Sequence, residues 1–224
     1  MDMLAKNPEL YSCPRCNKPY SNLPPDCWGQ HFGSFKGVCN ECYNWLTMNF
    51  DKQQILFVVG PDMSGKTNIA KAIVAETGFA YFKASSEHGT YLKSKNRFID
   101  QLRHADPRVA DFMKQTGVNV IMDRGFPCEY AYSKVLGRRT DKKMIKMMDE
   151  AYASLGSKIL FCHRSSYEGI IDDIDSKLDA QKLQLIHEAY EEFFKMSKCS
   201  VHHLNVDDED LKREVDEAIG FMIS

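Results

Sequence analysis

The chain has 224 residues, with 29 Lys or Arg, 31 Asp or Glu and 43% hydrophobic residues. At roughly 100–200 residues per domain, this length allows one α/β domain with a small appendage, and the composition argues against a disordered chain. No apolar run reaches the roughly 18 residues of a membrane span, and the N-terminus lacks a signal peptide's apolar stretch. We therefore expect a cytoplasmic protein without a membrane partner, whose eight cysteines are thiols or metal ligands rather than disulfides.

Charge is distributed unevenly along the chain, although the formal net charge is only −2. Residues 83–146 carry 14 basic and 7 acidic side chains, whereas residues 147–224 carry 8 basic and 17 acidic ones. A basic middle segment favours an anionic partner, but solvated helix faces that happen to segregate by charge would give the same asymmetry.

The first 50 residues contain two CxxC pairs and no sustained helical or strand periodicity. The pairs are separated by 22 residues and consist of Cys13, Cys16, Cys39 and Cys42. Two such pairs present four thiolates to one tetrahedral ion, which predicts a structural Zn²⁺ ribbon over residues 1–50. Two disulfides or a redox CxxC are the competing interpretations, and a reducing compartment makes them weaker.

From residue 55 onward, short apolar runs alternate with amphipathic stretches. The runs predict strands at 55–59, 79–82, 118–122, 158–162 and 201–206. The stretches between them predict helices at 67–77, 95–115, 129–135, 141–154, 179–195 and 208–222. This alternation is typical of an α/β domain with a five-stranded parallel sheet flanked by helices, here over residues 51–224.

The first predicted strand is followed by a GxxxxGK[ST] motif that opens a predicted helix, the context which a P-loop requires. The motif comprises Gly60, Pro61, Asp62, Met63, Ser64, Gly65, Lys66 and Thr67. Backbone amides of such a loop wrap phosphates at the helix N-terminus, while the Lys reaches the β- and γ-phosphates and the Thr hydroxyl binds Mg²⁺. We therefore expect ATP and Mg²⁺ to bind here.

A second polar motif, Asp123-Arg124-Gly125, directly follows the third predicted strand. A carboxylate at the end of a buried strand beside the P-loop can reach the Mg²⁺ shell, and the arginine can clamp phosphate oxygens. Lys66, Asp123 and Arg124 are thus the candidate catalytic residues. The competing interpretation is a strand-end Asp-Arg pair that caps the next helix.

Together, the strand–GPDMSGKT–helix unit, the FK that ends the second strand and the DRG after the third resemble the thymidylate kinase family. The resemblance implies a P-loop kinase fold over about three quarters of the chain. It also implies that Asp62 faces the 3′-hydroxyl of the acceptor, and that Lys83 and Arg97 contact the acceptor phosphate. The residues after the DRG are similar to phage-encoded members, which include kinases of 5-hydroxymethyl-deoxyuridine in DNA; in a phage protein the compartment would be the host cytoplasm.

One position departs from the family pattern. Family members sometimes carry a catalytic arginine in the loop where this chain has Met63. The resemblance therefore implies that an arginine from a lid takes this role, and Arg138, Arg139 and Arg164 are the candidates.

Three functions remain open from the sequence. The favoured one is a kinase that phosphorylates the hydroxymethyl group of 5-hydroxymethyl-2′-deoxyuridine in DNA, because it accounts for both the zinc ribbon and the basic segment. The second is a kinase that converts free dTMP, or a modified nucleotide, to its diphosphate. The third is a zinc-ribbon P-loop ATPase or nucleic-acid-binding module. The sequence leaves the oligomeric state open, and a homodimer is compatible with it.

Overall fold

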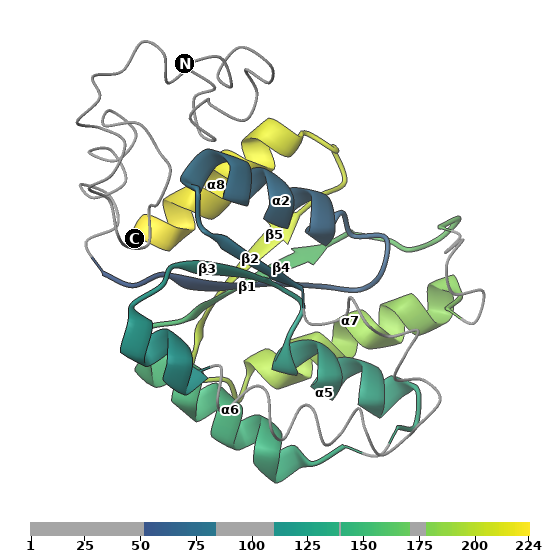
Figure 1. Cartoon of the computed structure of the whole chain (residues 1–224). Coiled ribbons are helices and arrows are strands. Elements are labelled where there is room, and N and C mark those ends of the chain that lie inside the picture. Colours follow the sequence, from purple (N-terminus) through teal and green to yellow (C-terminus); the bar gives the residue numbers. More distant parts are fainter. Residues whose placement is uncertain (1–51, 84–109, 139, 171–177) are drawn as a thin grey trace, which may run out of the picture.

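The computed structural model describes residues 52–83, 110–138, 140–170 and 178–224 (Figure 1). The predicted zinc ligands and Arg97 lie outside these residues. Within the described segments, five parallel strands form one sheet in the order β2-β3-β1-β4-β5. The strands are β1 (Ile55–Val59), β2 (Ala80–Lys83), β3 (Val120–Asp123), β4 (Lys158–His163) and β5 (Ser200–Asn205).

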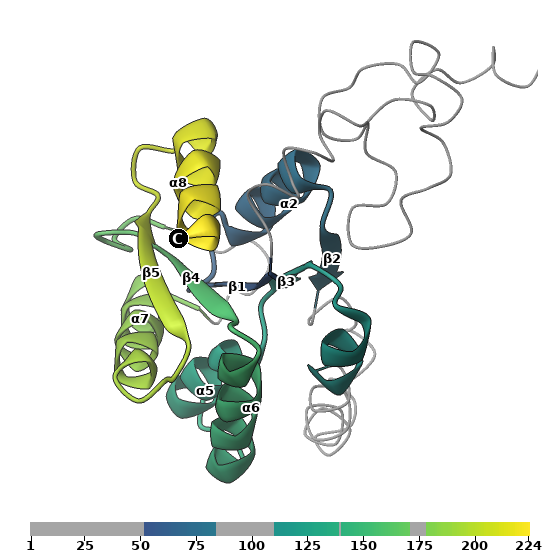
Figure 2. The ribbon, with the colours of Figure 1, turned by 90° about the vertical axis from the view of Figure 1, so that its left-hand side faces the viewer.

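Helices cover both faces of the sheet, as Figure 2 shows. They are α2 (Lys66–Thr77), α5 (Phe126–Val135), α6 (Lys142–Ser154), α7 (Ala180–Phe194) and α8 (Leu211–Ile223). Helices α2 and α8 lie on one face, and α5, α6 and α7 lie on the other. None of the described helices is long and apolar enough to cross a membrane.

Two apolar layers hold this arrangement together, one on each face of the sheet. Alternate side chains of β1 divide between them: Phe57 packs in the layer with α5, α6 and α7, whereas Leu56 and Val58 pack with α2 and α8. All five residues of β1 are buried. A central strand covered on both faces reads as a continuous apolar run, which is why its position was predictable without alternation.

The helix ends follow local capping chemistry, and here the predicted boundaries needed adjustment. Helix α5 begins at Phe126 rather than at 129, because Pro127 is accommodated in a first helical turn where its missing N–H is not needed. Helix α8 begins at Leu211 rather than at 208, because the Asp210 side chain accepts a hydrogen bond from the Arg213 amide and caps the helix. Of the helix predicted at 95–115, only residues 110–116 are described, and they are helical.

The sheet brings the predicted site residues together at one edge, the one formed by the carboxyl ends of its parallel strands. Val58, the penultimate residue of β1, pairs with Asp123 of β3, and Asp123 in turn pairs with Lys83 of β2. Because parallel strands all end at the same edge, the loops after β1, β2 and β3 meet there, where α/β sheets commonly bind ligands.

Candidate functional site

The loop between β1 and α2 is compact because two glycines permit its backbone path. A Cβ atom on Gly60 (φ 154°) would lie 2.1 Å from the carbonyl oxygen of Cys162, so no larger residue fits there. Gly65 adopts a left-handed conformation (φ 67°) at the start of α2. Ser64 closes the loop by donating a 2.8 Å hydrogen bond to the carbonyl of Pro61. The N-terminal amides of α2 therefore open at the sheet edge, where an anion can bind.

Lys66 lies inside this loop rather than in solvent. Its side chain is buried, and its Nζ donates to the Pro61 carbonyl at 2.8 Å and lies 3.2 Å from Oδ1 of Asp62. Burial, reinforced by the nearby charge of Arg124, lowers the pKa of the Lys66 ammonium. The Lys66 ammonium is thus held inside the loop by Pro61 and Asp62, and its phosphate-binding role stays a prediction.

Asp62 joins the loop to the motif after β3. Its Oδ1 accepts a 2.5 Å hydrogen bond from the Arg124 guanidinium as well as the contact with Lys66. Burial favours the neutral acid, but the charges of Lys66 and Arg124 outweigh it and lower the pKa of Asp62 to about 2. Asp62 is therefore ionised at physiological pH and shared between two cations.

Arg124 and Gly125 have unusual backbone conformations that place the arginine at this position. Arg124 has a left-handed φ of 75°, and its amide donates to the carbonyl of Val58 at 3.0 Å. Gly125 has φ 154°, and a Cβ there would lie 2.7 Å from the Phe57 ring. The guanidinium lies 5.8 Å from the centre of the Tyr132 ring, and its buried Nε has no hydrogen-bond partner among the described residues. The Nε–H edge of the guanidinium thus retains donor capacity for a ligand.

Asp123 gathers three donor side chains, one from α2 and two from β2, on a single oxygen. Its Oδ2 accepts from the Thr67 hydroxyl at 2.8 Å and from the Tyr81 hydroxyl at 2.7 Å, and it lies 3.5 Å from Nζ of Lys83. Its Oδ1 is buried and has no partner in the described part of the chain. The Thr67 hydroxyl donates its proton to Asp123 and accepts a long contact of 3.5 Å from Nζ of Lys83, which leaves one lone pair of its oxygen for a metal. A free carboxylate oxygen beside a hydroxyl oxygen fits the hard oxygen ligands that Mg²⁺ prefers.

Of the three arginines considered for a lid, Arg164 approaches the P-loop. Its Nε donates to the Met63 carbonyl at 3.1 Å, and its guanidinium also pairs with Glu209 at 2.9 Å. Arg138 follows the C-terminal end of α5, the end away from Asp123. Arg139 lies outside the described residues.

The structure thus brings together Asp62, Lys66, Thr67, Asp123 and Arg124, all of which were singled out from the sequence. Lys83 lies with them. It was expected to contact the acceptor phosphate, but its contacts are with Thr67 and Asp123, the residues expected to bind the metal. Tyr81 was missed. The signal for it was present, because residues two apart in a strand point to the same side, and Tyr81 precedes Lys83 by two positions.

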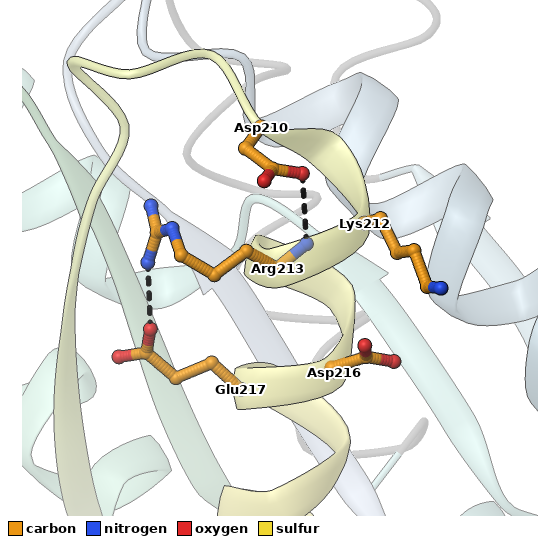
Figure 3. Close-up of a pocket in the computed structure, with 5 residues that line it drawn as sticks. All are labelled: Asp210, Lys212, Arg213, Asp216 and Glu217. Carbon is orange, nitrogen blue, oxygen red and sulfur yellow. Dashed lines mark hydrogen bonds and ion pairs between the residues drawn. The ribbon is translucent and has the colours of Figure 1, made fainter.

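Figure 3 shows a surface hollow on α8, lined by Asp210, Lys212, Arg213, Asp216 and Glu217. Its charged groups largely pair with one another: Asp210 caps the helix, and Arg213 pairs with Glu217 at 2.8 Å. None of these residues follows β1, β2 or β3. The hollow therefore adds nothing to the candidate site.

The overall fold is similar to solved structures of low sequence identity. The YorR protein from Bacillus subtilis, solved in complex with phosphorylated GDP, has a TM-score of 0.57 and 16% identity, covering 75% of this chain and 95% of that one. Thymidylate kinase from Ehrlichia chaffeensis has a TM-score of 0.50 and 15% identity, covering 76% and 98%. Deoxyadenosine kinase from M. mycoides with bound dATP has a TM-score of 0.49 and 17% identity, covering 77% and 100%.

Sequence comparisons add no closer relative: no protein-family model and no curated protein matches the chain. At identities of 15–16%, the two structures with TM-scores of 0.50 or more indicate the fold alone. They confirm the predicted α/β architecture. In this chain it is a five-stranded parallel sheet with helices on both faces.

Proposed function

We propose that this chain is an ATP- and Mg²⁺-dependent kinase that transfers the γ-phosphoryl group of ATP to a thymidine-type acceptor. The observation that carries the proposal is the Lys66–Asp62–Arg124 chain of contacts, set beside Thr67 and Asp123 at one sheet edge. A nucleotide ligand is also in keeping with the phosphorylated GDP bound in the YorR structure. A P-loop ATPase without an acceptor would have no evident need for Asp62 and Arg124.

Binding of the donor follows from the loop. The α2 amides and Lys66 would hold the β- and γ-phosphates, and Thr67 and Asp123 would hold Mg²⁺. Bound Mg²⁺ would neutralise charge on the phosphate oxygens. Arg124 is held in position by Asp62, and its Nε has no partner in the segments that the structure describes. It would stabilise the charge that develops on the transferring group.

The acceptor side is proposed from three residues. Asp62, within the P-loop, contacts Arg124 and would face a sugar hydroxyl of the acceptor. Lys83 and Arg97 would contact an acceptor phosphate. For an alcohol acceptor, such as a hydroxymethyl group, a proton must leave the oxygen. Asp123 would accept that proton or order the water around Mg²⁺. Its Oδ1, which has no partner within the described ranges of the chain, supports either role.

The favoured acceptor is the hydroxymethyl group of 5-hydroxymethyl-2′-deoxyuridine within phage DNA. The net positive charge of residues 83–146 supports a polyanionic substrate. A Zn²⁺ ribbon at residues 1–50, held by the four CxxC cysteines, would then serve to contact DNA. A base inside a duplex is out of reach of such a site, so the substrate would be single-stranded or flipped. Free dTMP is the alternative, for which the same basic segment would serve one small anion.

The test is to incubate the protein, Mg²⁺ and γ-labelled ATP with dTMP or with single-stranded DNA that contains 5-hydroxymethyluracil. Label in the DNA supports the favoured acceptor, label in the mononucleotide alone supports dTMP, and label in neither refutes the kinase proposal. Lys66→Ala should abolish transfer to whichever acceptor is used. The control is Lys71→Ala, which removes an exposed lysine from the same helix and should leave transfer unchanged.

A further inference from the structure

The carboxylate of Asp123 is held asymmetrically. All of its contacts from Thr67, Tyr81 and Lys83 go to Oδ2, whereas Oδ1 is buried without a partner among the described residues. A buried carboxylate oxygen that makes no hydrogen bond is costly. Such an atom is commonly found where a ligand, an ion or an ordered water completes the site.

The three donors to Oδ2 differ in what else they are expected to do. The Thr67 hydroxyl is shared with Mg²⁺ in the proposed function, and Lys83 is expected to contact the acceptor phosphate. Tyr81 is not expected to bind Mg²⁺ or the acceptor. Its hydroxyl donates to Oδ2 at 2.7 Å, and this is the shortest of the three contacts.

Strand pairing and packing hold Tyr81 in position for this contact. Tyr81 pairs in register with Ile121 on the neighbouring strand β3, two residues before Asp123. Its ring packs against the apolar layer beneath α2 and α8. Burial, together with the hydrogen bond to Asp123 and its charge, raises the pKa of the Tyr81 phenol well above its usual value. The short distance of 2.7 Å from this hydroxyl to Oδ2 makes Tyr81 the donor of the hydrogen bond.

We propose that Tyr81 is a positioning residue that anchors Asp123 through Oδ2 and thereby keeps Oδ1 available to the water shell of nucleotide-bound Mg²⁺. The inference rests on the proposed function, because it needs Mg²⁺ and ATP to bind at Thr67 and Asp123. Tyr81 does not touch the nucleotide in this scheme. Its effect passes through Asp123, which distinguishes it from a residue that only packs the edge strand.

The experiment measures ATP affinity by calorimetry in Mg²⁺ and in EDTA, so that the gain in affinity due to Mg²⁺ is obtained without turnover. The variants are Tyr81→Phe, Asp123→Asn and the double variant. Tyr130→Phe is the matched control, because its hydroxyl also donates to a carboxylate at 2.7 Å, that of Glu192, between α5 and α7. Thermal unfolding of each variant reports whether the fold is retained.

Tyr81→Phe is expected to reduce the Mg²⁺-dependent gain in affinity about tenfold, the effect of losing one hydrogen bond to a charged group, and to leave affinity in EDTA within about twofold. In the Asp123→Asn background, Tyr81→Phe should change the Mg²⁺-dependent gain in affinity by less than about twofold. The effects of two substitutions are not additive when one residue acts through the other. Tyr130→Phe should match the wild type.

Two results overturn the inference while leaving the proposed function intact. One is a Mg²⁺-dependent gain in Tyr81→Phe equal to that of the wild type and Tyr130→Phe. The other is that Tyr81→Phe reduces the Mg²⁺-dependent gain in ATP affinity equally in the wild-type and the Asp123→Asn backgrounds. If the wild-type protein binds ATP no more tightly with Mg²⁺ than in EDTA, the proposed function itself is refuted, and the proposed role of Tyr81 with it.

Discussion

Replacing Asp62 by Asn removes one negative charge from between two cations. Lys66 is 4% exposed and the Arg124 side chain 24% exposed, so water compensates for neither fully once the carboxylate is gone. Asn keeps a carbonyl oxygen of the same size that can accept one hydrogen bond. The substitution therefore tests the charge rather than the shape of the site.

The magnitude follows from the pKa of Asp62. Its fall from 3.8 to about 2 on folding means that the surroundings favour the ionised form by about 2.5 kcal/mol, at 1.36 kcal/mol per pKa unit. Breaking a buried ion pair by removing one partner costs about 3–5 kcal/mol, and the retained acceptor offsets part of that. We expect Asp62→Asn to lower the free energy of unfolding by about 2–3 kcal/mol at pH 7.

The assay is equilibrium unfolding in urea between pH 7 and pH 3. A carboxyl group with a depressed pKa stabilises the fold above its unfolded pKa of 3.8 and loses that contribution as the pH falls through about 2. The difference between wild type and Asp62→Asn should thus be constant near neutrality and shrink below about pH 4. Asp216→Asn, at an exposed position on α8, should stay within about 0.5 kcal/mol of the wild type. A loss at pH 7 no larger than that of the control would refute the proposed electrostatic role.

The remaining predictions concern the backbone after β3 and the N-terminal segment. Gly125→Ala should destabilise the protein by about 2–3 kcal/mol, because the new methyl group would lie 2.7 Å from the Phe57 ring at an unfavourable φ. Gly220→Ala, at a helical position with no atom near the added methyl group, should stabilise the protein by up to about 1 kcal/mol. Equal thermal stability of the two variants would contradict this reasoning. Cys39→Ser should release the predicted zinc, measured by elemental analysis, and weaken DNA phosphorylation more than ATP binding; full retention of zinc would rule out Cys39 as a ligand.

The sequence was most informative where a residue type admits a single backbone or chemical environment. The run at β1 and the loop from Gly60 to Thr67 follow from burial on both faces and from the need for glycine. The contact between Asp62 and Arg124 was not predictable in this way, because it depends on β1 and β3 being neighbours in the sheet. Neither the strand order nor the left-handed turn at Arg124 leaves a periodic signal. Tyr81 was overlooked for a related reason: as an aromatic residue in an apolar strand, it reads as core.

Backbone strain supports the sheet edge, rather than the hollow on α8, as the functional region. In the described part of the chain, the non-glycine residues with positive φ are Met63, Arg124 and Glu209. Each follows the end of a strand at this edge, and such conformations cost about 1–3 kcal/mol each unless the surroundings impose them. Arg164 links two of them, because it donates to the Met63 carbonyl and pairs with Glu209. The contacts that hold these conformations therefore converge on the P-loop, where a phosphate-binding site needs its backbone fixed before the ligand arrives.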